Sequence, residues 1–105
     1  MVDWVRTEEL RQDFGEEDFL EIAGMFIAEV EERLASLAGK SPASLSEDFH
    51  FLKGSAANLG FHSFQVACSQ AETAPQHADL AHINELFATS KDAFLDRYQR
   101  DKQVA

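Results

Sequence analysis

Apolar residues recur every three or four positions along most of the chain, which is the period of a helix with one buried face. This period predicts helices over residues 16 or 17 to about 38, 44–60, 61–74 and 79 to about 100, and a short helix over 2–14. No segment alternates apolar and polar residues as a half-buried strand would. We therefore predict an all-α protein. Residues 101–105 follow the last predicted helix and are expected to fray.

Glycine and proline residues separate these stretches. Gly15 follows the stretch 2–14, and Pro75 follows the stretch 61–74. The segment 39–42, before the stretch 44–60, contains both a glycine and a proline. Asp79 can cap the last helix. Because the turns are short, consecutive helices are expected to be antiparallel neighbours. The sequence thus predicts an up-down-up-down four-helix bundle with a short extra N-terminal helix across one end.

The stretch 44–60 has the clearest helix signals. Ser44 and Glu47 have the spacing of a capping box, and Gly60 stands where a left-handed residue would end the helix. Its apolar residues fall on one stripe, made up of Leu45, Phe49, Leu52, Ala56 and Leu59. This stripe is expected to be buried in the core.

His50 lies well away from that stripe, so its imidazole is expected to face solvent. Lys53, three residues later, places a cation on the same side of the helix. A glycine in a helix interior lowers the stability of the helix by roughly 1 kcal/mol relative to alanine, so the presence of Gly54 here calls for an explanation. Clearance for another molecule beside the imidazole is the reason that we infer. An exposed imidazole with open space and a cation beside it suits reversible phosphorylation.

The segment His-Phe-Leu-Lys-Gly-Ser-Ala-Ala-Asn-Leu-Gly, residues 50–60, resembles the signature of histidine-containing phosphotransfer (HPt) domains. The resemblance is strongest over residues 50–72 and implies a single HPt domain over 1–105. It implies that His50 is phosphorylated, with Lys53 and Gly54 as the family's lysine and glycine. The implied function is a phosphorelay intermediate, which accepts a phosphoryl group from a receiver-domain phospho-aspartate and passes it to another receiver aspartate.

The resemblance also implies the partners. These are receiver domains of response regulators, and a hybrid histidine kinase is compatible as another. We expect no cofactor bound to this chain, because the receiver would supply the Mg²⁺. The candidate docking surface consists of Ser46, Ala57, Phe61 and Phe64. In this family a polar side chain of the following helix often lies near the imidazole, and Gln65, Ser69 and Glu72 remain open alternatives for it.

Composition limits the other function classes. With 105 residues the chain is long enough for one domain, and its formal net charge of -10 disfavours nucleic acid and anionic membranes as partners. We expect a cytoplasmic location, because no signal peptide or membrane span is recognisable. We expect a monomer, because each helix has one apolar face and the bundle already uses it. The initial methionine and short tail favour a free-standing protein. Cys68 is expected to pack in the core, and the spacing of His77 and His82 does not suit a zinc site.

Two other functions are alternatives to a phosphorelay intermediate. In the phosphoacceptor part of a histidine kinase an acidic residue typically follows the histidine, but Phe51 follows His50 here, so no autonomous kinase activity is expected. The alternative is a non-catalytic HPt-like bundle that binds and sequesters a signalling partner. Only the intact motif around His50 argues against this alternative.

Overall fold

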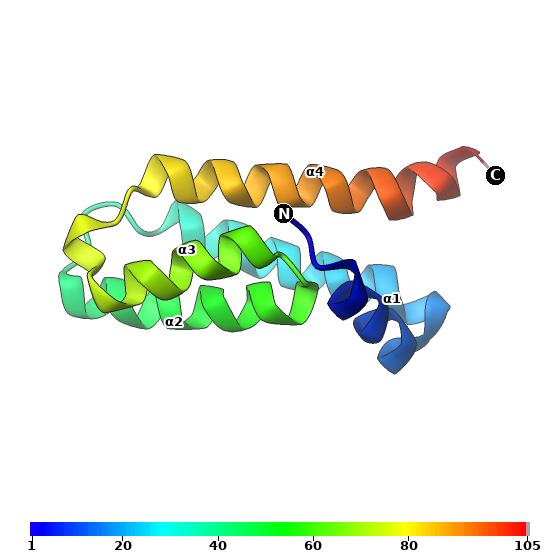
Figure 1. Cartoon of the computed structure of the whole chain (residues 1–105), viewed down its shortest axis with the longest axis horizontal. Coiled ribbons are helices and arrows are strands. Elements are labelled where there is room, and N and C mark those ends of the chain that lie inside the picture. Colours follow the sequence, from blue (N-terminus) through cyan, green and yellow to red (C-terminus); the bar gives the residue numbers. More distant parts are fainter. Residues whose placement is uncertain (105) are drawn as a thin grey trace.

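Four α-helices form an all-α structure in the computed structural model, which describes residues 1–104 and the side chains of residues 1–98. The helices are α1 (Trp4–Ala35), α2 (Pro42–Leu59), α3 (His62–Thr73) and α4 (Leu80–Val104), with a 3₁₀ turn, η1 (Pro75–His77), before α4. Successive helices reverse direction along the bundle (Figure 1). None of the helices in this part of the chain combines the length and the apolar character needed to cross a membrane.

The helix α1 contains one break. Gly15 has φ 80° and ψ 158°, which are not helical values, so it forms a kink in α1. Figure 1 shows that the first part of α1 runs at an angle to the rest. Gly15 thus interrupts the helix where the sequence predicted a stop. A separate N-terminal helix is not shown, because residues 4–14 form the first part of α1. At the other end of the chain α4 continues to Val104, so the fraying expected from residue 101 is not seen, and Ala105 lies outside the described residues.

The helix α2 begins earlier than the sequence predicted. Its N-cap is Ser41, whose hydroxyl accepts a hydrogen bond from the backbone N–H of Ser44 at 3.3 Å. Pro42 occupies the first turn, where its fixed φ and its missing N–H suit a helix start. The predicted capping box of Ser44 and Glu47 is therefore wrong. The predicted end is confirmed, since Gly60 has φ 81° in the left-handed region.

The core lies between the helices and is rich in phenylalanine. The predicted stripe of α2 is confirmed, with Phe49, Leu52, Ala56 and Leu59 buried and Leu45 partly buried. Further aromatic side chains that pack there in tilted or edge-to-face pairs are Phe19, Phe61, Phe64, Phe87 and Phe94. Cys68 is buried as expected, and burial raises the pKa of its thiol to about 12. Such a thiol is protonated at neutral pH and packs as a small apolar group.

The start of the chain covers the C-terminal end of α2. The Asp3 N–H donates to the Gly60 carbonyl at 2.7 Å, and the buried Thr7 hydroxyl donates to the Leu59 carbonyl at 2.8 Å. The Arg6 Nε donates to the Ala57 carbonyl at 3.2 Å. Carbonyl groups in the last turn of a helix lack the usual N–H partner four residues later, and these three donors satisfy carbonyl groups at this end of α2.

Candidate functional site

The predicted phosphoacceptor lies on the outer side of α2. The neighbouring residues Phe49 and Leu52 are fully buried, and they fix the face that α2 turns to the core. His50 therefore points outward, with 70% of its side chain exposed. An imidazole in this position is open to a macromolecular partner without any opening of the bundle.

Glu72 of α3 connects the imidazole to the nearby lysine. Its Oε1 lies 2.8 Å from His50 Nδ1, and its Oε2 accepts a hydrogen bond from Lys53 Nζ at 2.6 Å. The Ser46 hydroxyl donates to the Glu72 backbone carbonyl at 3.1 Å, which ties this end of α3 to α2. One carboxylate thus holds both side chains of α2 that the motif singles out.

The charge of Glu72 determines which ring nitrogen is free. The hydrogen bond from Lys53, followed by that from His50, holds the pKa of Glu72 below its ordinary value of 4.5. Glu72 is therefore ionised at neutral pH, and an ionised carboxylate can only accept hydrogen bonds. It follows that the proton of a neutral His50 ring resides on Nδ1 and that Nε2 carries the lone pair.

Gly54 lies one turn after His50 and is exposed. A Cβ built on this residue would meet no atom within 4 Å. The packing of the bundle therefore gives no reason for a glycine here, although a helix interior favours alanine. The space that Gly54 leaves lies outside the protein, beside the imidazole.

The other predicted surface residues divide into two pairs. Ser46 and Ala57 are partly exposed on α2, so both side chains are accessible from outside the bundle. The assignment of Phe61 and Phe64 to the docking surface is wrong, because both side chains are fully buried. Their rings pack against Phe87 of α4, at centroid distances of 6.0 and 5.3 Å. These two residues hold α3 against α4 and cannot touch a partner in this structure.

The sequence left three residues of α3 open as the neighbour of the imidazole, and the structure selects Glu72. No contact with His50 is recorded for Gln65 or Ser69 in the described part of the chain. Sequence reasoning did not predict the contact of Arg6 with α2. Its contact with Ala57 joins residues 51 positions apart, and no local spacing indicates such a pair.

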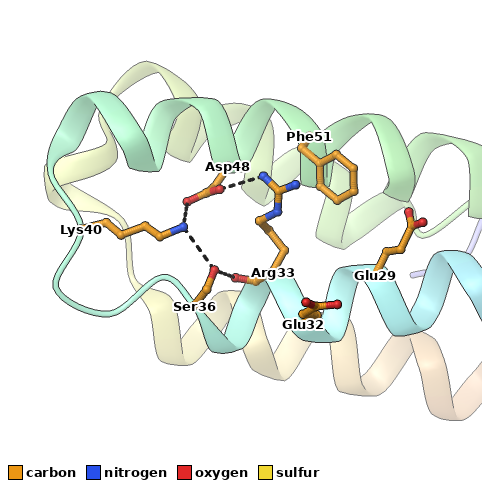
Figure 2. Close-up of a pocket in the computed structure, with 7 residues that line it drawn as sticks. All are labelled: Glu29, Glu32, Arg33, Ser36, Lys40, Asp48 and Phe51. Carbon is orange, nitrogen blue, oxygen red and sulfur yellow. Dashed lines mark hydrogen bonds and ion pairs between the residues drawn. The ribbon is translucent and has the colours of Figure 1, made fainter.

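A cavity of about 420 Å³ lies between α1 and α2. Figure 2 shows the Asp48 carboxylate between the Lys40 ammonium and the Arg33 guanidinium, at 2.7 and 2.9 Å. Arg33 also lies over the Phe51 ring, 4.1 Å from its centroid. The remaining lining residues are Glu29, Glu32 and Ser36. None of the predicted site residues lines this cavity, so its ion pairs serve to hold α1 and the following loop to α2.

Within the described residues, no three His, Cys, Asp or Glu side chains are grouped so as to hold a metal ion.

Comparison with known proteins identifies the family of the chain. Searches of curated proteins and of solved structures found no match. The family model described as "Hpt domain" matches residues 21–101, which include the whole of α2 and α3. Because the match spans most of the chain, the protein belongs to the Hpt domain family.

Proposed function

We propose that His50 is the phosphorylated residue of this protein. Hpt domains transfer phosphoryl groups on a histidine in phosphorelays and generally interact with receiver domains. In our proposal His50 accepts the group from the phospho-aspartate of one receiver and passes it to the aspartate of another. Two properties of His50 support this assignment. Its side chain is 70% exposed, and its Nδ1 lies 2.8 Å from the Glu72 carboxylate.

The contact prepares the ring for attack. With the proton held on Nδ1, the Nε2 lone pair attacks phosphorus, the bond between phosphorus and the aspartate oxygen breaks, and the aspartate carboxylate leaves. The new bond joins Nε2 to phosphorus. The ring gains positive charge in this step, and the adjacent Glu72 carboxylate stabilises it while Nδ1 keeps its proton. Transfer to the second receiver reverses these bond changes.

Lys53 and Gly54 complete the proposed site. The Lys53 ammonium lies on the same side of α2 as His50 and supplies positive charge near the incoming oxygens. Gly54 leaves room for the loops of the receiver, and Ser46 and Ala57 extend the docking surface along α2. The Mg²⁺ ion and the aspartate belong to the receiver. The chain would thus contribute a positioned nucleophile and a docking face.

The test is transfer of labelled phosphate from a phosphorylated receiver domain, run with the wild type, His50→Gln and His62→Gln. His62 is an exposed histidine at the start of α3, so it serves as the matched control. We expect label on the wild type and on His62→Gln, under conditions that preserve acid-labile phosphohistidine, and none on His50→Gln. Label retained by His50→Gln would contradict the assignment.

Two further outcomes address the rival functions. Incubation with ATP alone is expected to leave the protein unlabelled, and rapid self-labelling would show a kinase activity instead. A wild type that binds receivers across a panel but takes no phosphate from any of them would support the non-catalytic binding bundle.

A further inference from the structure

Arg6 is the exception among the basic side chains that the structure describes, because it has no carboxylate partner. The pairs formed by the others are Arg11 with Glu8 and Glu16, Arg33 and Lys40 with Asp48, Lys53 with Glu72, Lys91 with Glu31, and Arg97 with Glu8. Acidic residues outnumber basic ones by 19 to 9 in the chain. The hydrogen bond to the Ala57 carbonyl accounts for the position of Arg6 but leaves the charge of its guanidinium without a carboxylate.

Two hydrogen bonds fix the position of the Arg6 guanidinium. Its Nε donates to the Ala57 carbonyl at 3.2 Å, and its Nη2 donates to the Asn58 side-chain oxygen at 3.3 Å. A guanidinium has five N–H groups in a rigid planar fork, so three of them stay available. Because the side chain is already held, binding an anionic group there loses little conformational entropy.

The position of Arg6 relates it to the proposed phosphoacceptor. Ala57 follows His50 by seven residues, so the two residues share a face of α2 and lie about 10.5 Å apart along it. A protein–protein interface of standard size covers ~800 Å² on each partner, which is a circle with a radius of about 16 Å. A receiver centred on His50 therefore reaches the end of α2 where Arg6 is bound.

We propose that Arg6 is a docking residue that pairs with a carboxylate on the surface of the receiver. This inference rests on the proposed function, because it takes the receiver as the occupant of the His50 face. The net charge of -10 repels an acidic partner, and a fixed guanidinium on the docking face compensates for that repulsion at one point. A planar fork binds a carboxylate through two parallel hydrogen bonds, so the pair also sets orientation.

The test measures the dissociation constant of a Mg²⁺-loaded, unphosphorylated receiver by calorimetry, in the His50→Gln background. Arg6→Glu is compared with Lys91→Glu, since both variants change the net charge by the same amount. Lys91 pairs with Glu31 between α4 and α1, so it lies off the His50 face. We expect Arg6→Glu to weaken binding at least 10-fold and Lys91→Glu to weaken it less than 2-fold. Arg6→Gln replaces Arg6→Glu if circular dichroism shows that the latter is unfolded.

A second measurement identifies the partner of Arg6. Changing acidic residues around the receiver's aspartate to lysine one at a time is expected to restore the binding of Arg6→Glu at one position. Equal dissociation constants for Arg6→Glu and Lys91→Glu, or a wild type that binds no receiver, would overturn the proposal. Binding that depends on Arg6 without any phosphate transfer would confirm the docking role and contradict only the proposed function.

Discussion

His50 and Glu72 lie at equal distances of 11 residues on either side of Phe61, and their side chains meet at 2.8 Å. Phe61 stands at the turn between α2 and α3, so the two residues occupy the same level of an antiparallel helix pair. Glu72 belongs to the site because of the hairpin geometry. Its effect on the imidazole can be tested separately from its effect on the fold.

Replacing Glu72 should slow phosphoryl transfer without preventing it. In Glu72→Ala the imidazole loses the acceptor that holds the proton on Nδ1, and both ring tautomers become populated. We expect the transfer rate to fall roughly 10-fold, by analogy with imidazoles that are oriented through their second nitrogen in metal sites. Labelled-phosphate kinetics give the rate, and ¹⁵N NMR of the His50 ring gives the tautomer.

Gln65→Ala provides the control for this variant, because Gln65 lies on the same helix without a recorded contact to His50. It should leave both the transfer rate and the ring tautomer unchanged. An unchanged tautomer in Glu72→Ala would show that the hydrogen bond does not position the ring.

Substitutions of Gly54 should separate helix stability from docking. Its Cβ position is open, so Gly54→Ala is expected to raise the free energy of unfolding by roughly 0.5–1 kcal/mol. Gly54→Leu should fold equally well but crowd the receiver and slow transfer. Urea unfolding and transfer kinetics measure the two effects. If Gly54→Leu transferred phosphate at the wild-type rate, the clearance beside His50 would have no role.

Gly60 should tolerate substitution far less well. An added Cβ would lie 2.5 Å from the Thr7 hydroxyl and 2.6 Å from the Asp3 carbonyl oxygen, at a residue with φ 81°. We expect Gly60→Ala to cost about 2–4 kcal/mol, since it combines backbone strain with a steric clash. The matched control is Gly39→Ala, with φ 79° and open space, which should cost about 1 kcal/mol. Similar losses in the two variants would show that contact with the start of the chain is unimportant.

The ion pairs of Asp48 should make the stability of the fold depend on pH. Burial alone would raise its pKa, but hydrogen bonds from Lys40 and Arg33 outweigh burial and hold the pKa below its ordinary 3.8. Because the folded-state pKa is the lower one, the stabilisation is present above the ordinary value of 3.8 and is lost as the pH falls through the lower folded-state pKa. Asp48→Asn should cost about 1–3 kcal/mol at pH 7.

The measurement for Asp48 is the midpoint of thermal unfolding between pH 3 and pH 7. The difference between the wild type and Asp48→Asn should shrink toward the acid end of this range. Asp92→Asn is the control, because Asp92 is exposed and forms no recorded ion pair. A difference that stays constant with pH would contradict the role of the Asp48 charge.

The helices themselves were predictable from the sequence, because a buried face requires apolar residues at the helical period. The stripe from Phe49 to Leu59 is buried as that period predicts. The start of α2 was not predictable from spacing, since both Ser41 and Ser44 can cap a helix. The choice depends on whether Pro42 ends one segment or begins the next, and its fixed φ suits the beginning.

The candidate site was predictable only in part. Helical spacing placed His50 away from the core, but it could not show that Phe61 and Phe64 are covered, because that depends on where α4 packs. The contact of Arg6 with α2 could not be predicted either, because it joins residues that are 51 positions apart. Contacts within a helix follow from spacing, whereas contacts between helices follow from the packing of the whole chain.

The placement of His50, Lys53 and Glu72 within one helical hairpin also bears on how the protein folds. These side chains are at most 22 positions apart, whereas the hydrogen bond from the Tyr98 hydroxyl to Glu8 closes a loop of 90 positions. The entropy of loop closure delays such distant contacts, so the hairpin is expected to form before the chain ends meet. The contacts of His50 and Lys53 with Glu72 are then expected to form before the contacts that join the two ends of the chain.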